Sequence, residues 1–106
     1  MNLGILDVSP SLTATGTTQG TALELINGIA FVGTVPSGTG VALNPNATPG
    51  TPQIAYNGGA NGLNVYPPSG YKINNLAVNS SHVLATNTAC QYWFVSSTQI
   101  IGILSA

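Results

Sequence analysis

Residues 21–35 read Thr21-Ala22-Leu23-Glu24-Leu25-Ile26-Asn27-Gly28-Ile29-Ala30-Phe31-Val32-Gly33-Thr34-Val35. Two apolar runs, rich in β-branched residues, flank Asn27-Gly28. Asn-Gly favours a type I′ turn, whose two central residues both need positive φ, and it is the strongest short-range signal for a β-hairpin. The sequence therefore predicts a hairpin that places Ile26 opposite Ile29. A helix over residues 22–29 is the alternative, which the glycines and β-branched residues disfavour.

Both faces of this predicted hairpin are apolar. In the hairpin register one face would carry Leu23, Leu25, Ala30 and Val32, and the other would carry Glu24, Ile26, Ile29 and Phe31. A hairpin at the surface of a monomer alternates apolar and polar residues instead. We therefore expect this hairpin to lie centrally in the fold or to be covered on its second face by another chain.

The rest of the chain has the same character. About seven or eight short strands follow one another at a spacing of roughly 8–12 residues, separated by turns rich in Gly, Pro and Asn. Residues 53–56 and 63–66 predict a second hairpin with a longer loop, and residues 89–95 form the strongest single strand. No helical period persists for ten residues.

These patterns predict an all-β fold in one domain, residues 1–106. We expect an antiparallel β-sandwich or barrel, jelly-roll-like, with residues 1–20 as a candidate extended N-terminal arm. The predicted core consists of Leu23, Leu25, Val32, Leu63, Val65, Val83, Phe94 and Ile101.

Charge is almost absent. The 106 residues include three charged ones, Asp7, Glu24 and Lys72, where an average domain of this length would have roughly 26. One lysine cannot neutralise a series of phosphates, so binding to nucleic acid is excluded. A small domain with so little charge is also poorly soluble as a free monomer. We therefore expect a subunit of a larger assembly.

No constellation of residues predicts catalysis. Ser80-Ser81-His82 with Asp7, or Cys90 with His82, could supply a nucleophile and a base, but no G-x-S-x-G elbow or supporting motif accompanies them. The single histidine, the single cysteine and two separated carboxylates show no metal-ligand spacing. We expect no enzyme activity, no catalytic residues, no metal and no cofactor. Cys90 lies in an apolar run and predicts a buried thiol.

No signal peptide and no apolar run of about 20 residues is seen, so we expect neither export by a signal of its own nor a membrane partner.

Ala55-Tyr56-Asn57-Gly58-Gly59-Ala60-Asn61-Gly62-Leu63-Asn64-Val65-Tyr66-Pro67-Pro68-Ser69-Gly70 resembles a pattern found in small virion proteins of tailed bacteriophages. In that pattern an N-x-G-A-N-x-L-x-V-Y-P core precedes an I-N-x-L segment, here Ile73-Asn74-Asn75-Leu76, and an aromatic strand, here residues 92–94. The likeness covers about residues 52–96 and carries no catalytic residues. It implies a β-rich structural subunit of a phage particle.

Within that class, the resemblance implies a capsid decoration (cement) protein, bound as a homotrimer to the major capsid protein. Its location would be the capsid surface of the virion, after assembly in the cytoplasm of the host bacterium. The predicted contact residues lie in two segments that could form sheet edges: Leu3, Ile5 and Leu6, and Ile100, Ile101, Ile103 and Leu104.

The alternative is the base of a tail spike or fibre, or its receptor- or glycan-binding module. Five aromatic residues could then form a surface that stacks on sugars: Tyr56, Tyr66, Tyr71, Tyr92 and Trp93.

Overall fold

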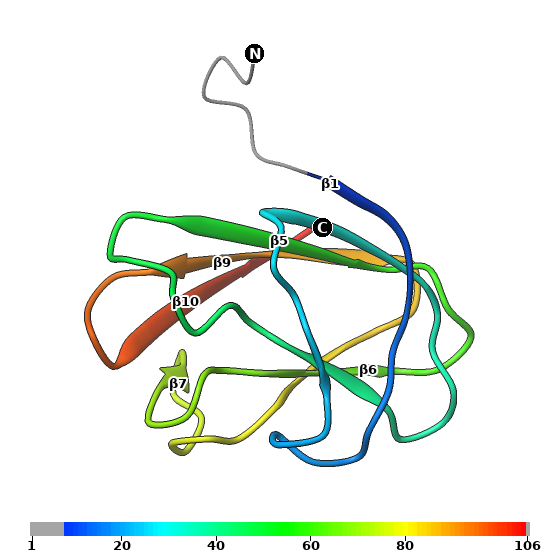
Figure 1. Cartoon of the computed structure of the whole chain (residues 1–106), viewed down its shortest axis with the longest axis horizontal. Helices are drawn as coiled ribbons and strands as arrows, with labels where there is room; N and C mark the ends of the chain where they lie inside the picture. The colour runs from blue at the N-terminus through cyan, green and yellow to red at the C-terminus, as the bar shows by residue number, and fades with distance from the viewer. Residues whose placement is uncertain (1–7, 106) are drawn as a thin grey trace.

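The computed structural model describes residues 8–105, which form two β-sheets and no helix. Sheet A has six strands in the order β1-β3-β5-β9-β10-β7, and sheet B has four in the order β2-β4-β6-β8 (Figure 1). The prediction of an all-β fold is confirmed. The strands are β1 (Val8–Thr13), β2 (Leu23–Glu24), β3 (Ile29–Thr34), β4 (Gly40–Ala42), β5 (Pro52–Asn57), β6 (Leu63–Tyr66), β7 (Lys72–Ile73), β8 (His82–Leu84), β9 (Thr88–Phe94) and β10 (Gln99–Leu104).

The chain crosses from one sheet to the other after each of its first five strands. The odd-numbered strands β1, β3 and β5 pair in parallel in sheet A, and β2, β4 and β6 pair in parallel in sheet B. This stacking resembles the turns of a solenoid. Only β8 and β9 reverse direction, pairing antiparallel with β6 and β5, and β10 then pairs antiparallel with β9. The predicted antiparallel pairing throughout is therefore wrong.

The predicted hairpin around Asn27-Gly28 does not form. The two flanking runs, β2 and β3, lie in different sheets, and Asn27 does not adopt the positive φ of a type I′ turn. The reason is that each run pairs with a strand that is distant in the sequence: β2 pairs with β4, and β3 pairs with β1 and β5. Leu25 and Val32 are buried between the sheets, at 2% and 0% exposed, whereas Ile26 and Phe31 of the second predicted face remain 71% and 44% exposed.

The second predicted hairpin is also wrong, because β5 and β6 lie in different sheets. The turn at residues 96–98 does connect a true antiparallel pair, β9 and β10. Residues 8–13, part of the candidate N-terminal arm, form β1 and pair with β3.

A buried glutamine helps to hold the crossing at Asn27. Gln53 of β5 donates from Nε2 to the carbonyl oxygens of Leu25, at 2.9 Å, and of Asn27, at 3.1 Å. Its Oε1 accepts from the main-chain N–H of Asn44 at 2.8 Å. Main-chain groups at the crossing are thus satisfied by a side chain from the next turn of the chain.

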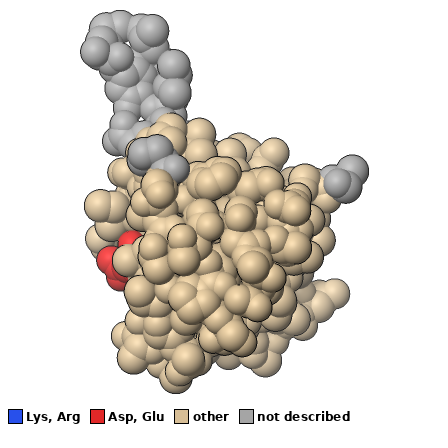
Figure 2. All heavy atoms as spheres, turned by 90° about the vertical axis from the view of Figure 1, so that its right-hand side faces the viewer, with Lys and Arg blue, Asp and Glu red and all other residues tan. Residues whose placement is uncertain are grey.

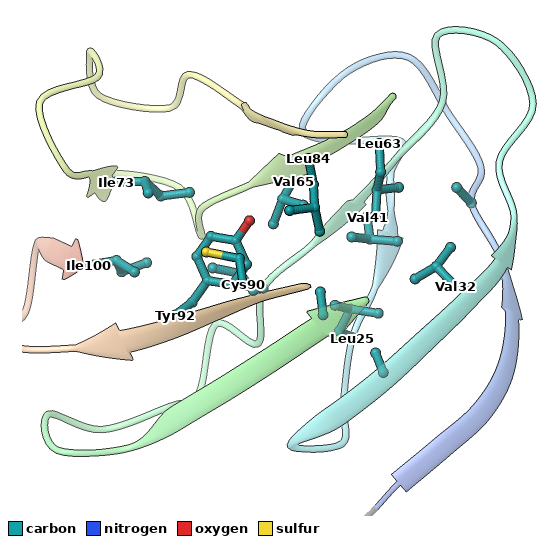
Figure 3. Close-up of a cluster of buried hydrophobic side chains, with 14 of the residues drawn as sticks. Leu25, Val32, Val41, Leu63, Val65, Ile73, Leu84, Cys90, Tyr92 and Ile100 are labelled. Carbon is teal, nitrogen blue, oxygen red and sulfur yellow. The ribbon is translucent and has the colours of Figure 1, made fainter. Parts of the chain in front are cut away.

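The core lies between the two sheets. Figure 3 shows Leu63 and Val65 of β6 and Cys90 and Tyr92 of β9 among the side chains that fill it. Of the predicted core residues, Leu25, Val32, Leu63, Val65 and Phe94 are buried, and Leu23 packs at the margin.

Two predicted core residues are wrong. Val83 is 61% exposed and Ile101 is 43% exposed. Each is adjacent to a buried residue, Leu84 or Ile100, and alternation along a strand turns the neighbour of an inward side chain outward.

Candidate functional site: the outer face of sheet A

Sheet A turns a second apolar surface away from the core. Its strands alternate, so the residues between the buried positions of β3, β5, β9 and β10 point outward. We call this surface the outer face of sheet A. Its residues are Val8, Ile29, Phe31, Pro52, Ile54, Tyr56, Ala89, Gln91, Trp93, Ile101 and Ile103.

The strand register aligns these side chains in rows across the sheet. One row crosses five strands and consists of Val8, Ile29, Ile54, Gln91 and Ile103. Gln91 is its only polar member. Side chains in register on neighbouring strands touch, so Val8, Ile29 and Ile54 form an apolar ridge, which Gln91 separates from Ile103.

Two shorter rows flank this ridge. Phe31 lies beside Tyr56, with the two rings stacked at a centroid distance of 5.1 Å, and Tyr56 lies opposite Ala89. On the other side Trp93 lies between Pro52 and Ile101. Together the three rows cover most of the width of sheet A with side chains that are mostly apolar and uncharged.

Several of these side chains are well exposed. Val8 and Ile103 are 52% and 53% exposed, and Phe31 and Ile101 are 44% and 43% exposed. None of the residues of the outer face is charged. Figure 2 shows one side of the molecule, where nearly all atoms belong to uncharged residues. A contiguous, exposed apolar surface of this kind is typical of a protein-interaction site.

The predicted contact residues are distributed between this face and the core. Ile101 and Ile103 belong to the outer face, and Leu104 is half exposed at the end of β10. Ile100 was expected at a contact, but it is fully buried and packs within the core, so it cannot reach a partner. Leu3, Ile5 and Leu6 lie outside the described residues.

The sequence reasoning missed several members of the site. Ile54 was not assigned to a contact surface, and Trp93 was assigned only to the surface of the sugar-binding alternative. Ile29 and Phe31 could have been found, because both lie on the second apolar face of residues 21–35. Their partners come from β5 and β9, which residue spacing alone does not link to β3.

His82, the only histidine, is bonded to a tyrosine rather than to a serine. Its Nδ1 lies 2.8 Å from the hydroxyl of Tyr92, and burial lowers the pKa of His82. Burial raises the pKa of Tyr92, so the phenol remains protonated and can donate this bond to neutral imidazole. The contact connects β8 of sheet B to β9 of sheet A.

Cys90 lies next to this pair in the core, as predicted from its apolar run. Burial raises the pKa of its thiol, which is the opposite of the shift that activates a cysteine nucleophile. Among residues 8–105 no group of three or more His, Cys, Asp or Glu side chains could hold a metal ion. The same residues include no helix long and apolar enough to cross a membrane.

The five aromatic residues of the sugar-binding alternative do not gather on one surface. Tyr92 is part of the core, and Tyr71 packs edge-on against Phe94 of the core. The hydroxyl of Tyr66 donates to a main-chain carbonyl. Only Tyr56 and Trp93 lie on the outer face of sheet A.

No protein-family model matches this chain, and no curated protein or solved structure matches it significantly.

Proposed function

We propose that this chain is a non-enzymatic structural protein of a phage virion, a decoration or cement protein that binds the major capsid protein as a homotrimer and stabilises the head. The observation that carries the proposal is the outer face of sheet A, an exposed surface with three apolar rows and no charge. The resemblance of residues 52–96 to small virion proteins agrees with it.

The energy available from this face is sufficient for such a role. Complete burial of one large apolar side chain contributes about 1.5–3 kcal/mol. Val8, Phe31, Ile101 and Ile103 are each about half exposed. Covering these four would therefore contribute about 3–6 kcal/mol, equivalent to a factor of roughly 10² to 10⁴ in affinity. Many identical copies on one lattice multiply the effect on the stability of the particle.

The lack of charge has a consequence for how such contacts respond to salt. Screening weakens interactions between charges, and its range falls to ~3 Å at 1 M salt. Contacts made by apolar rows are not weakened in this way and become slightly stronger in excluded salts such as sulfate. We expect decoration to persist in 1 M sodium chloride.

The test uses substitutions on the outer face and a matched control. Ile103→Asp places a carboxylate in the central row, and burying it against a partner should lower affinity by about tenfold or more. Val83→Asp changes an equally exposed valine on sheet B and should have little effect. Binding is measured by co-sedimentation with heads of the phage that encodes the chain, assembled without it.

Equal binding by Ile103→Asp and wild type would contradict the proposal. A glycan array on the purified protein tests the alternative of a receptor- or glycan-binding module of a tail spike or fibre. Selective sugar binding that Tyr56→Ala abolishes would favour that alternative over the decoration protein.

A further inference from the structure

The edge of β10 that faces away from β9 is partly open. The carbonyl of Gln99 accepts from the N–H of Val95, directly after β9, and the N–H of Ser105 donates to Ala89 of β9. In an antiparallel pair such bonds alternate along the strand, so Ile100, Gly102 and Leu104 direct their main-chain groups toward the opposite edge.

β7 covers only the beginning of that edge. Its two residues pair with Gln99 and Ile100, and the side chain of Asn74 then accepts a bond from the N–H of Gly102 at 2.9 Å. Within residues 8–105, the carbonyl of Gly102 and the main-chain groups of Leu104 have no hydrogen-bond partner on this side. Leu104 is also 56% exposed. An open strand edge of this kind accepts an added segment of another chain.

The only cation of the chain lies beside this edge. Lys72 of β7 is exposed and lines a shallow hollow together with Asn74, Asn75, Gln99 and Ile101. The other side chains of the hollow are neutral, so a segment that brings a single carboxylate would complement it. The chain has two carboxylates, Asp7 and Glu24.

Position distinguishes the two carboxylates. Glu24 lies on β2, the edge strand of the other sheet, and lines a separate hollow with Gln19 and Pro67. Asp7 directly precedes β1, the strand at the opposite edge of the same sheet as β7. The sequence before it, Met1-Asn2-Leu3-Gly4-Ile5-Leu6, supplies apolar side chains for the exposed end of β10.

Asp7 cannot reach Lys72 of its own chain. Five strand-to-strand steps separate β1 from β7 in sheet A, which at about 4.8 Å each amounts to roughly 24 Å. Consecutive Cα atoms are held about 3.8 Å apart by the peptide bond, and Val8, which follows Asp7 in the sequence, belongs to β1. A contact between Asp7 and Lys72 therefore requires two copies of the chain.

We propose that the N-terminal segment of each copy, residues 1–7, docks on the open edge of β10 in a neighbouring copy, with Asp7 paired to Lys72. The contact joins two unlike edges of sheet A, and such a heterologous contact forms a ring when the rotation between copies closes, as it does in a homotrimer. The inference rests on the proposed function in one respect, because it explains how the homotrimer closes. It also leaves the outer face of sheet A free for the capsid lattice.

A charge-swap experiment tests this contact. Lys72→Glu and Asp7→Lys each place like charges together and should raise the protein concentration at the midpoint of assembly by about tenfold. The double variant restores opposite charges and should return the midpoint to within about threefold of wild type. Glu24→Lys is the matched control, and it should neither weaken assembly nor rescue Lys72→Glu.

Assembly is measured by sedimentation equilibrium of the full-length protein at low salt, with circular dichroism to verify the fold of each variant. Lys72→Ala should shift the midpoint by less than about fivefold, because exposed ion pairs contribute little when simply removed. The inference is overturned if both charge reversals assemble like wild type, if the double variant is not restored, or if Glu24→Lys rescues Lys72→Glu. If Lys72→Glu fails to fold, the assembly midpoint of Asp7→Lys alone tests the contact.

Failure of this inference and failure of the proposed function can be told apart. If the double variant does not regain the wild-type assembly midpoint but still decorates heads normally, the edge contact is contradicted and the proposed function stands. A restored trimer that does not bind heads would support the edge contact and contradict the proposed function.

Discussion

Asn57→Ala is expected to destabilise the fold strongly, although Asn57 belongs to neither the hydrophobic core nor the outer face. Asn57 ends β5 and is fully buried. Its Nδ2 donates to the carbonyl oxygens of Leu84 and Asn61, each at 2.8 Å, and its Oδ1 accepts from the N–H of Gly59 at 2.9 Å. One side chain thus ties sheet A to β8 of sheet B and to the loop that crosses between the sheets.

The magnitude follows from the burial of the three partners. The bond to Leu84 is buried, and an unsatisfied buried carbonyl costs about 1–3 kcal/mol. The other two bonds are partly buried, and each contributes about 0.5–1.5 kcal/mol net. The expected loss is therefore about 2–6 kcal/mol, a large part of the total of about 5–15 kcal/mol for a domain. In a domain of about this size, 1 kcal/mol shifts Tm by roughly 4–8 °C, so Tm should fall by at least about 8 °C.

The assay is thermal unfolding followed by circular dichroism, with urea unfolding for the free energy. Asn64→Ala is the matched control, because Asn64 makes one exposed bond, from Nδ2 to the carbonyl of Gly38 at 3.3 Å. Its free energy of unfolding should change by less than about 0.5 kcal/mol. Equal stabilities for the two variants would refute the idea that buried amides hold the crossings.

Two further predictions concern the packing of the sheets and their response to pH. Gly40→Ala would drive a new Cβ into the carbonyl of Asn64 on the neighbouring strand and should cost about 1–3 kcal/mol by urea unfolding, whereas Gly20→Ala meets open space and should cost far less. Burial lowers the pKa of His82, so the unfolded state binds more protons at mildly acidic pH. Stability is then fully present above about pH 6.5 and lost as the pH falls through the lowered pKa of the folded state. His82→Gln should flatten this dependence in urea titrations between about pH 7.5 and 5, and an unchanged slope would argue against the role of His82.

The sequence was sufficient to predict an all-β fold of short strands and most of the core. Alternation identified Leu63, Val65 and Phe94 as inward, because a strand with one buried face repeats every two residues. The same rule fails where the phase is uncertain. In the run Ile100-Ile101 both residues are isoleucine, so the sequence did not show which one faces the core.

Strand partners could not be predicted from local patterns. Asn27-Gly28 is a strong turn signal over four residues, but the partners of β3 are β1 and β5, which are distant in the sequence. The choice between a hairpin and a crossing depends on how much apolar surface the whole fold buries. The choice also depends on Gln53, whose side chain satisfies main-chain carbonyls at the crossing and which no local sequence pattern identifies.

The parallel stacking also disfavours like charges at positions in register on neighbouring strands. In-register parallel strands place successive turns of the chain side by side, so one residue of each turn contacts its equivalent in the next. Ile29 lies beside Ile54 on the outer face, and Val41 lies beside Val65 in the core.

A charged residue repeated at such positions would face a like charge in the next turn, and like charges directly opposite are destabilising. Neutral polar residues have no such cost, and they are abundant in the loops. The same stacking aligns apolar residues into the rows of the outer face. In such a fold, the stacking that forms sheet A also produces its exposed apolar outer face. Covering that face with another protein would take this apolar surface out of water.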